Sequence, residues 1–453
     1  MLSAALSQLA TWLDGTVHGD DVTIHGVGHD TRSLAPGMLY VALLGERFDG
    51  HDFLGQAQAA GAVAALVSQP AADSTLPQLQ VADTQAALAE LARRHRNRMP
   101  AQIAAITGSN GKTTVKNLAA TILARLGPTY ANPGNFNNEI GLPLSVLELA
   151  SGHHHAVLEM GAGKPGDIQW LCAIARPQVG LVNNIAPAHL ERMGNLAGIA
   201  ETKGAIIDAL PARGVAIINA DDSFAETFAR RAGGRPVLRF GLQAAADVHA
   251  QIDTIGAGSR FRLHTPVGSG DINLPLAGRH NIANALAAAA IGCAFNAHFD
   301  DIQAGLEAAP TTSGRLQLLP QAGGYTLIDD SYNANPASVQ AAIDTVVTLP
   351  GEPWLVLGDM GELGPDAVSL HADIGRLARQ AGIVRLFTLG ELSHEASVAF
   401  GSGGKHFNQR RDLVEHLRHA LAPGVVCLVK GSRSAGMERV LAALAAGGHD
   451  HAA

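Results

Sequence analysis

The strongest chemical signal in the sequence is IAAITGSNGKTT, residues 103–114. An apolar run leads into Thr-Gly-Ser-Asn and then a Gly-Lys-Thr-Thr group, and a helical pattern, VKNLAATILARL, follows. Glycines let backbone amides wrap around phosphate oxygens, and a helix N-terminus adds a favourable dipole. Lys112 would neutralise the β- and γ-phosphates, and the Thr113 hydroxyl would hold Mg²⁺.

This segment predicts a nucleoside-triphosphate site. Its residues are Thr107, Gly108, Ser109, Asn110, Gly111, Lys112, Thr113 and Thr114. The general P-loop has its first glycine where this chain has Ile106. The alternative is a tight glycine turn between strand and helix.

A second group of polar residues follows later apolar runs. Glu159 ends HAVLEM, His189 lies beyond VGLVNN, and Lys203 stands in IAETKGAI. Open α/β sheets place their ligands at the carboxyl ends of strands, so a carboxylate and an imidazole near the triphosphate would make a Mg²⁺ environment. Taken alone, each residue also has a structural interpretation, as a strand-end carboxylate, a loop histidine or a solvated lysine.

Three further segments carry weaker signals. GRHNIAN, residues 278–284, contains amide and imidazole side chains that could recognise a purine edge, although Asn281 could instead cap a helix. DDSYNANP, residues 329–336, has a density of polar groups typical of a site. Arg315 and the segment KGSR, residues 430–433, could reach anions. The histidines 153–155 and the tail GGHDHAA are not predicted to bind metal, since consecutive residues entering a strand point in opposite directions.

These residues need elements to position them, and apolar runs predict those elements. Residues 1–82 alternate short apolar runs with turn signals and predict a small α/β module, whose first 15 residues form an amphipathic helix. A helix is expected from Asp83 to Met99, with a solvated, arginine-rich end. Buried parallel strands are predicted for IAAIT, HAVLEM, VGLVNN and GVAIIN, and a hairpin is predicted for SRFRLHTP and DINLPL. The strands of a third unit are predicted for YTLIDD, PWLVLGD, VRLFTLG and VVCLVKG.

Composition narrows the class of protein. The 453 residues are 47% hydrophobic and 16% charged, which excludes a chain disordered throughout and suits about three domains. A net charge of −8 argues against general affinity for nucleic acid or anionic membranes. The three cysteines are far apart among apolar neighbours, as in a reducing compartment. No targeting or membrane-spanning segment is recognised, and we expect a cytoplasmic protein.

Blocks along almost the whole chain resemble the Mur ligases, ATP-dependent amide-bond-forming enzymes of peptidoglycan precursor synthesis. They include DTRSLAPGMLYVALLGERFDGHDF, TGSNGKTT, GNFNNEIG, VLEMGA, NNIAPAHLERMG, GRHNIANA, DDSYNANP and LVKGSRSAGME. The family's own P-loop has the shorter TGxNGKT form, so Ile106 is no departure from it. GNFNNEIG and DDSYNANP are similar to the member that adds D-alanyl-D-alanine. The resemblance implies an α/β protein of three domains: an N-terminal UDP-binding module (1–82), a central P-loop parallel-sheet ATPase (83–312) and a C-terminal Rossmann-like domain (313–453).

The resemblance also assigns residues. It implies that Thr113 and Glu159 hold one Mg²⁺ and His189 a second, and that Lys203 carries a carbamate. It places Lys112, Glu159, His189 and Lys203 in the catalytic centre. Around the nucleotide it implies His280, Asn281 and Asn284 at adenine, Asp330 at the ribose and Arg315 at the phosphates. For the other substrates it implies Thr31, Arg47, Asp49, Asn137, Asn138, Asn333, Asn335, Lys430, Ser432 and Arg433.

The implied reaction joins D-alanyl-D-alanine to UDP-N-acetylmuramoyl-tripeptide through an acyl phosphate, with ADP and phosphate released. A monomer is expected, with the C-terminal domain closing over the site about a hinge near residue 312. Two alternatives stay open. One is a sister ligase that adds diaminopimelate or lysine, or a folate polyglutamate ligase; the other is a P-loop ATPase that uses nucleotide only as a conformational switch. The third residue of the tripeptide is not fixed by these motifs.

Overall fold

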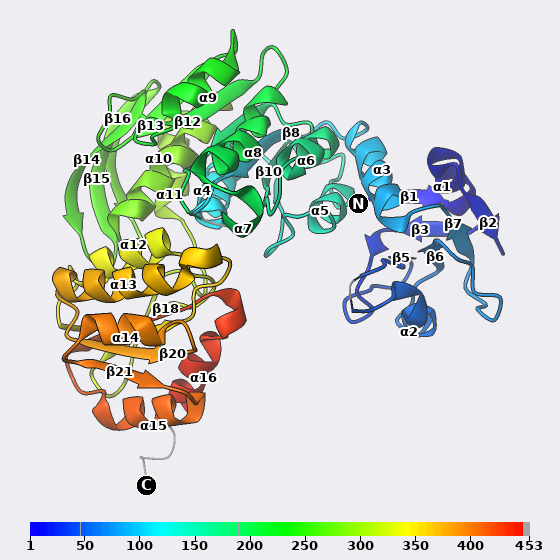
Figure 1. Ribbon diagram of the computed structural model, residues 1–453. Helices are drawn as coiled ribbons and strands as arrows, with labels where there is room; N and C mark the ends of the chain where they lie inside the picture. The colour runs from blue at the N-terminus through cyan, green and yellow to red at the C-terminus, as the bar shows by residue number, and fades with distance from the viewer. Residues whose placement is uncertain (46, 188–189, 447–453) are drawn as a thin grey trace.

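The computed structural model describes residues 1–45, 47–187 and 190–446, and these form three α/β units, each built on its own main sheet (Figure 1). The predicted fold class is confirmed: an N-terminal module is followed by a central, largely parallel-sheet domain and by a C-terminal sheet domain. The boundaries expected near residues 82 and 312 stay a prediction.

The N-terminal unit has a five-stranded sheet of order β2-β7-β6-β5-β4 and a separate β1-β3 pair. The expected N-terminal helix is partly wrong. Ser3–Ala5 pairs with Thr23–His25 as a strand, and helix α1 begins only at Leu6. The elements are β1 (Ser3–Ala5), α1 (Leu6–Leu13), β2 (Thr16–His18), β3 (Thr23–His25), β4 (Val27–Gly28), β5 (Leu39–Val41), α2 (Leu54–Ala59), β6 (Ala64–Val67) and β7 (Gln78–Gln80).

Helix α3 (Thr84–Arg96) connects this unit to the central one, and Figure 1 shows it between them. Asp83 caps it by accepting hydrogen bonds from the backbone N–H groups of residues 85 and 86. The expectation of a solvated basic end holds for Arg93 but is wrong for Arg96. That side chain is buried because its Nε donates to the carbonyl of Ala175, at 2.7 Å. Arg96 therefore ties α3 to the central domain.

The central unit is a nine-stranded sheet of order β16-β15-β14-β13-β12-β11-β8-β10-β9. The strands from β9 to β14 pair in parallel, and β14, β15 and β16 form an antiparallel extension, which confirms the predicted parallel strands and hairpin. The strands are β8 (Gln102–Thr107), β9 (Thr129–Ala131), β10 (His155–Glu159), β11 (Val179–Val182), β12 (Val215–Asn219), β13 (Val237–Gly241), β14 (Val248–Ile255), β15 (Ser259–Thr265) and β16 (Gly268–Leu274).

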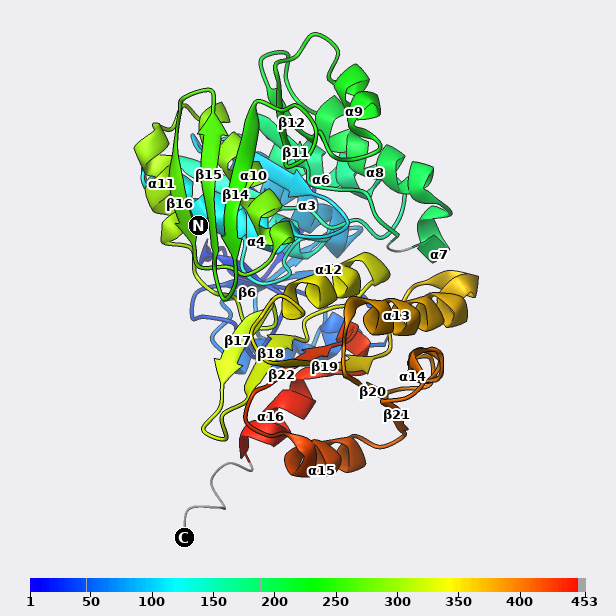
Figure 2. The ribbon, with the colours of Figure 1, turned by 90° about the vertical axis from the view of Figure 1, so that its left-hand side faces the viewer.

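Helices cover both faces of this sheet (Figure 2). Apolar residues of α4, α10 and α11 pack in one core, and those of α5, α6, α8 and α9 in another that also contains α3. Helix α10 is alanine-rich and almost fully buried, since small side chains let neighbouring elements approach closely. The helices are α4 (Lys112–Ala124), α5 (Gly141–Leu147), α6 (Asp167–Ala175), α7 (Leu190–Met193), α8 (Leu196–Asp208), α9 (Ala225–Ala232), α10 (Arg279–Ala294) and α11 (Phe299–Glu307).

The C-terminal unit has six strands in the order β17-β18-β22-β19-β20-β21. Among the described strands of this sheet, only β17 is antiparallel to its neighbour, and β22, the last of them in sequence, lies between β18 and β19. The strands are β17 (Gln317–Pro320), β18 (Thr326–Asp330), β19 (Glu352–Gly358), β20 (Arg385–Leu389), β21 (Gly404–Phe407) and β22 (Val425–Lys430). These include the four strands predicted for this unit.

Two helical layers enclose the C-terminal sheet. Helices α12, α13 and α14 pack on one face, and α15 and α16 on the other. Their bounds are α12 (Pro336–Val346), α13 (Ala367–Ala381), α14 (His394–Phe400), α15 (Arg410–Ala420) and α16 (Glu438–Ala446). In the described part of the chain, no helix is both long and apolar enough to cross a membrane.

Candidate active site

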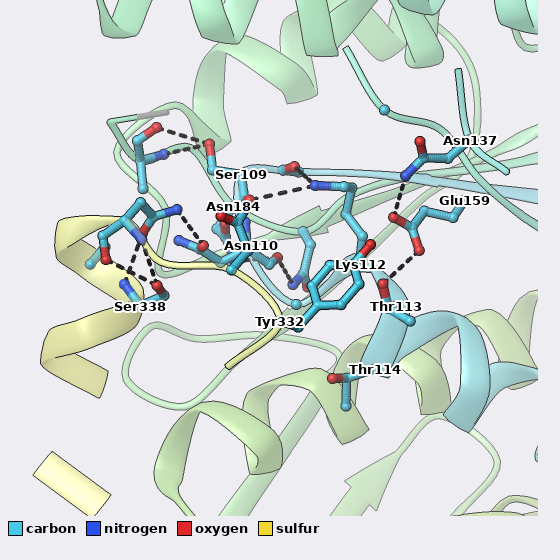
Figure 3. A pocket seen from close by; sticks show the side chains of 18 of the residues that line it. Ser109, Asn110, Lys112, Thr113, Thr114, Asn137, Glu159, Asn184, Tyr332 and Ser338 are labelled. Atoms are coloured by element: carbon cyan, nitrogen blue, oxygen red, sulfur yellow. Dashed lines mark hydrogen bonds between the residues drawn. The ribbon is translucent and has the colours of Figure 1, made fainter. Parts of the chain in front are cut away.

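A cavity of about 840 Å³ lies where the central and C-terminal units face each other (Figure 3). Its walls come from the carboxyl ends of β8, β10 and β11, the start of α10 and the loops after β18 and β22. The size is within the range of small-molecule sites. The predicted site residues that line it are Gly108, Ser109, Asn110, Gly111, Lys112, Thr113, Thr114, Asn137, Asn138, Glu159, Lys203, His280, Asn281, Asn284, Arg315, Asp330, Asn333, Asn335, Lys430 and Arg433.

The loop between β8 and α4 has the conformation that its glycines were predicted to allow. Gly111 has φ +79°, and a Cβ there would lie 2.3 Å from Oδ1 of Asn284, so only glycine fits. Helix α4 starts at Lys112 with no side-chain cap, which leaves its first N–H groups available to an anion. Nζ of Lys112 donates to the carbonyl of Gly108 at 2.8 Å, so the lysine lies across the loop.

Both carboxylate oxygens of Glu159 accept hydrogen bonds from side chains that line the cavity. Its side chain is buried at the end of β10, where Oε2 accepts a 2.8 Å hydrogen bond from Thr113 and Oε1 a 2.7 Å bond from Nδ2 of Asn137. Figure 3 shows the three side chains converging. A hydroxyl and a carboxylate are the oxygen ligands that Mg²⁺ prefers, so this pair fits a magnesium ion.

Lys203 lies on α8 and lines the same cavity, although it is 2% exposed. Burial, and after it the charge of Lys112, lowers the pKa of Lys203 to about 7. Burial likewise lowers the pKa of Lys112, against the opposing charge of Glu159. Lys203 is therefore an amine that can be neutral near pH 7 beside Lys112 and the loop between β8 and α4.

The start of α10 supplies the segment predicted to recognise a purine. Gly278 is the N-cap, so Asn281 does not cap the helix; its Nδ2 instead donates to the carbonyl of Ala277 at 2.8 Å. Nδ2 of Asn284 donates to Oδ1 of Asn281 at 3.1 Å. His280 lines the cavity, and burial lowers its pKa to about 4 despite the charge of Asp330. This corner is a neutral set of amide and imidazole groups.

Arg315 connects the C-terminal unit to the end of the loop between β8 and α4, residues 108–111, which we call the phosphate loop after its predicted ligand. Its Nη2 lies 3.4 Å from Oγ1 of Thr113, and its guanidinium lies over the ring of Tyr332, with 4.1 Å between Cζ and the ring centroid. Nε of Arg315 is buried with no hydrogen-bond partner among the described residues. The arginine is therefore held by stacking and keeps donor capacity for an anion.

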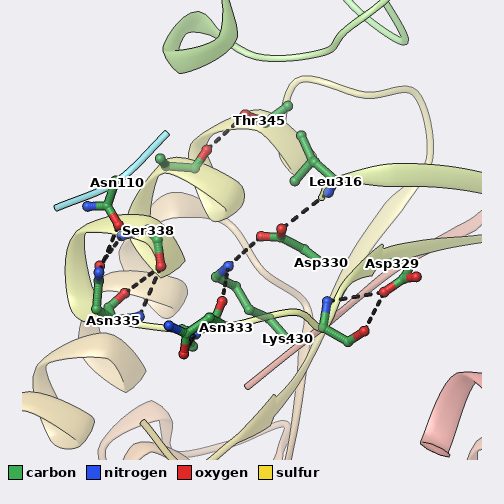
Figure 4. A network of polar contacts seen from close by, with 12 residues as sticks. Asn110, Leu316, Asp329, Asp330, Asn333, Asn335, Ser338, Thr345 and Lys430 are labelled. Carbon is green, nitrogen blue, oxygen red and sulfur yellow. Dashed lines mark hydrogen bonds and ion pairs between the residues drawn. The ribbon is translucent and has the colours of Figure 1, made fainter. Parts of the chain in front are cut away.

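Asp330, at the end of β18, and Lys430, at the end of β22, form a buried ion pair in the C-terminal unit (Figure 4). Nζ of Lys430 lies 2.5 Å from Oδ2 of Asp330 and donates to the carbonyl of Asn333 at 3.0 Å. Oδ1 of Asp330 accepts from the backbone N–H of Leu316 at 3.2 Å. The pair fixes the loops that carry Asn333 and Asn335, and contact between Asp330 and a ribose stays a prediction.

Several predicted site residues do not line the cavity. Thr107 is buried and donates to the carbonyl of Met160, and Ser432 donates to the carbonyl of Asp359, so both support loops. Thr31, Arg47 and Asp49 lie in the N-terminal unit; Asp49 caps a 3₁₀ turn, residues 50–53, by accepting from His51. Their predicted contact with a UDP-sugar stays a prediction. His189 and the tail GGHDHAA are outside the described residues.

The cavity also includes residues that the sequence analysis missed. Asn183 and Asn184 follow β11, and both side chains donate to the carbonyl of Asn110, at 2.9 and 3.1 Å. The paired asparagines at the end of a predicted strand were the available signal. Tyr332 was passed over within DDSYNANP. The histidines 153–155 belong to no cluster able to hold a metal in residues 1–45, 47–187 and 190–446.

Family models cover most of the chain. They are described as Mur ligase family, catalytic domain (residues 23–96), Mur ligase middle domain (106–292) and Mur ligase, glutamate ligase domain (314–433). The UDP-N-acetylmuramoyl-tripeptide–D-alanyl-D-alanine ligase of Escherichia coli strain K12 is 47% identical over 448 residues, which cover 98% of this chain and 99% of that protein.

Solved structures agree with the sequence matches. A crystal structure of MurF from Acinetobacter baumannii has a TM-score of 0.92 at 35% identity and covers 98% of this chain and 99% of its own. A MurF ligase from Thermotoga maritima, in complex with ADP, has a TM-score of 0.83 at 28% identity and covers 94% of this chain and 99% of its own.

Proposed function

The chain belongs to the Mur ligase family, and we propose that it is the ATP-dependent ligase that joins D-alanyl-D-alanine to UDP-N-acetylmuramoyl-tripeptide, giving the UDP-muramoyl-pentapeptide of peptidoglycan synthesis with ADP and phosphate. The observation that supports this function is that the phosphate loop, Glu159 and Arg315 of the C-terminal unit all line one cavity. The relative of nearly equal length that is 47% identical has this activity in its name.

The reaction needs an activated carboxylate, because a free carboxylate is a poor electrophile. An oxygen of the tripeptide's terminal carboxylate attacks the γ-phosphorus of ATP, the bond to the β-γ bridging oxygen breaks, and ADP leaves. The amine of D-alanyl-D-alanine then attacks the acyl carbon and loses a proton, and the tetrahedral intermediate collapses to the amide and phosphate. The acyl phosphate reacts with water, so a site closed by two domains favours transfer to the amine.

The residues of the cavity divide this work. The N–H groups at the start of α4 and Nζ of Lys112 hold phosphate oxygens, and Arg315 adds positive charge from the C-terminal side. Thr113 and Glu159 would hold a Mg²⁺ ion, which would supply positive charge to the triphosphate. His280, Asn281 and Asn284 line the adenine end. Asn137 and Asn138 line the cavity on the side of Glu159, and we assign them to the peptide substrate.

Lys203 is proposed to carry a carbamate. Its neutral amine nitrogen adds to the carbon of CO₂ and loses one proton, which replaces a cation by an oxygen-bearing anion. The support is its burial beside Lys112, its pKa of about 7 and the resemblance to the family. The resulting carboxylate would give the cavity a further oxygen ligand for Mg²⁺, and the family resemblance adds a second ion at His189, which is outside the described residues.

The remaining parts of the proposal concern the rest of the molecule. Thr31, Arg47 and Asp49 of the N-terminal unit are proposed to meet the UDP-sugar, and the domains to be 1–82, 83–312 and 313–453. We propose a cytoplasmic monomer; the three free cysteines support the reducing compartment. Contacts across the cavity, such as Arg315 with Thr113, support closure of the C-terminal domain over the nucleotide.

Phosphate release from ATP tests the function, with UDP-N-acetylmuramoyl-tripeptide present and amine acceptors varied one at a time. We expect release to require D-alanyl-D-alanine and the product to have the mass of the pentapeptide. Phosphate release that is stimulated most by a single amino acid would indicate instead a sister ligase of the same family. Release indifferent to every acceptor would support a nucleotide switch and contradict the proposal.

A further inference from the structure

Lys116 is a buried cation next to the cavity to which the proposed chemistry gives no role. It lies on α4, one helical turn after Lys112, and is 3% exposed. Its side chain reaches the segment of residues 132–138. Nζ donates to the backbone carbonyl of Asn132 at 2.6 Å and lies 3.5 Å from that of Gly134. An ammonium is costly to bury, so a buried lysine needs partners such as these two carbonyl groups.

Asn132, whose carbonyl accepts from Lys116, is hydrogen-bonded through its side chain to the backbone of Glu159. It is 1% exposed, and its Oδ1 accepts from the N–H of Glu159 at 2.9 Å. Its Nδ2 donates to the carbonyl of Phe136 at 2.8 Å and lies 3.2 Å from the carbonyl of Glu159. One side chain therefore joins the end of β10 to the loop of residues 132–138.

Asn137, at the other end of this loop, orients the side chain of Glu159. Its Nδ2 donates to Oε1 of Glu159, and its backbone carbonyl accepts from the N–H of Gly161 at 2.8 Å. The loop therefore holds Glu159 by its backbone on one side and by its carboxylate on the other. Lys116 is the group of α4 that fastens this loop.

We propose that Lys116 is a positioning residue that holds the loop of residues 132–138 against α4, so that Asn137 keeps the Glu159 carboxylate turned toward Thr113. The inference rests on the proposed function in one respect, that Glu159 and Thr113 hold the magnesium of a bound nucleotide. Helix α4 then positions both proposed ligands: it carries Thr113 directly, and through Lys116 it supports the loop that orients Glu159. Removing a group that hydrogen-bonds a metal ligand, as Asn137 does here, commonly changes metal affinity by about 10- to 100-fold, and Lys116 acts one contact further out, so we expect the lower end of that range.

The test compares Lys116→Met with Arg96→Met. Arg96 is a matched control: it is also a buried cation of the same domain that donates to backbone carbonyls, those of Ala175 and Met99, and it does not line the cavity. Calorimetry measures the affinity of each variant for ADP, with Mg²⁺ and with EDTA. Amide hydrogen exchange measures the protection of residues 132–138.

For Lys116→Met we expect the gain in ADP affinity that Mg²⁺ brings to fall about 10-fold, with affinity in EDTA unchanged and faster exchange in the loop. Arg96→Met is expected to lower the melting temperature and keep the wild-type response to Mg²⁺. Lys116→Arg, which keeps a donor for the Asn132 carbonyl, should recover most of the response. Lys116→Gln, of similar length but uncharged, replaces Lys116→Met as the loss variant if Lys116→Met does not fold.

A folded Lys116→Met protein with wild-type Mg²⁺ response and loop protection would overturn the inference, as would an equal loss in Arg96→Met. The proposed function fails separately, when the wild-type protein does not release phosphate in response to D-alanyl-D-alanine. In that case the comparison of ADP binding still decides whether Lys116 acts on the metal site.

Discussion

The side-chain amide of Asn335 donates a 2.7 Å hydrogen bond to Oδ1 of Asn110, across 225 positions of sequence. Asn110 belongs to the phosphate loop, and Asn335 is the N-cap of α12 in the C-terminal unit (Figure 4). Asn110 also accepts, through its backbone carbonyl, from Asn183 and Asn184. The phosphate loop is thus held by its own domain on one side and by the opposite domain on the other.

Asn335→Ser separates the interdomain bond from helix capping. Serine keeps a hydroxyl for the N–H of Ser338, which Asn335 now caps, but it is too short to reach Asn110. We expect nucleotide affinity to fall by up to about 10-fold, the value of one hydrogen bond, with little change in stability. Asn335→Ala loses the cap as well and should cost about 1 kcal/mol of unfolding free energy. Equal nucleotide affinity in Asn335→Ser and wild type would contradict a role for this bond in closure.

Glu159→Gln removes a charge while keeping the shape and an oxygen that can accept from Thr113. Since the carboxylate is the anionic ligand at this position, ATP turnover should fall by roughly 100-fold or more, and Mg²⁺ should no longer tighten nucleotide binding. The unfolding free energy should change little. Tyr130 donates to Glu148, an exposed acid of the same domain away from the cavity, so Glu148→Gln is the control. Turnover in Glu159→Gln that matches the control would remove Glu159 from the metal site.

Lys203 should bind carbon dioxide covalently. The folded protein, exchanged into ¹³C-labelled bicarbonate, should give one carbamate carbon resonance that disappears in Lys203→Met. Lys116→Met serves as a comparison, because it removes another buried lysine of the domain without removing the proposed carbamate. A wild-type protein with full ligase activity and no carbamate signal would exclude the modification from the mechanism.

His280 should make the protein less stable in acid. Burial lowers its pKa from 6.5 to about 4, so between these values the unfolded chain binds a proton that the folded chain does not. Protonation of His280 in the unfolded chain therefore leaves the unfolding free energy unchanged above pH 6.5 and lowers it progressively as the pH falls from 6.5 toward 4. Urea denaturation of wild type and His280→Gln across this range should show the steeper decline in wild type. Parallel curves would mean that His280 is protonated normally in the folded protein.

Local patterns predicted the phosphate loop and the strands well. The P-loop is a contiguous strand, glycine turn and helix, so its geometry depends on neighbouring residues alone. The parallel strands were apolar runs long enough to recognise. Glu159 was found for the same reason, since it ends such a run at the edge of the sheet where ligands bind.

Groups that gain their role from distant partners could not be predicted this way. Nothing near Asn335 in the sequence indicates Asn110, and Lys116 has the spacing of an ordinary helical lysine. Arg96 was expected in solvent because arginine usually lies there, yet the carbonyl of Ala175, 79 residues away, satisfies it inside the protein. The N-terminal strand was missed because three residues carry too little pattern to outweigh the helical spacing that follows.

The position of β22 has a consequence for the synthesis of the protein. Among the described strands this one comes last in the sequence, yet it lies between β18 and β19, so the C-terminal sheet has a gap until Val425–Lys430 has left the ribosome. Lys430, the partner of Asp330, arrives with it. A chain whose synthesis has not yet reached β22 lacks the strand that carries Lys430, so the cavity wall opposite the phosphate loop is incomplete, and we expect ligation only after residues 425–430 have been made.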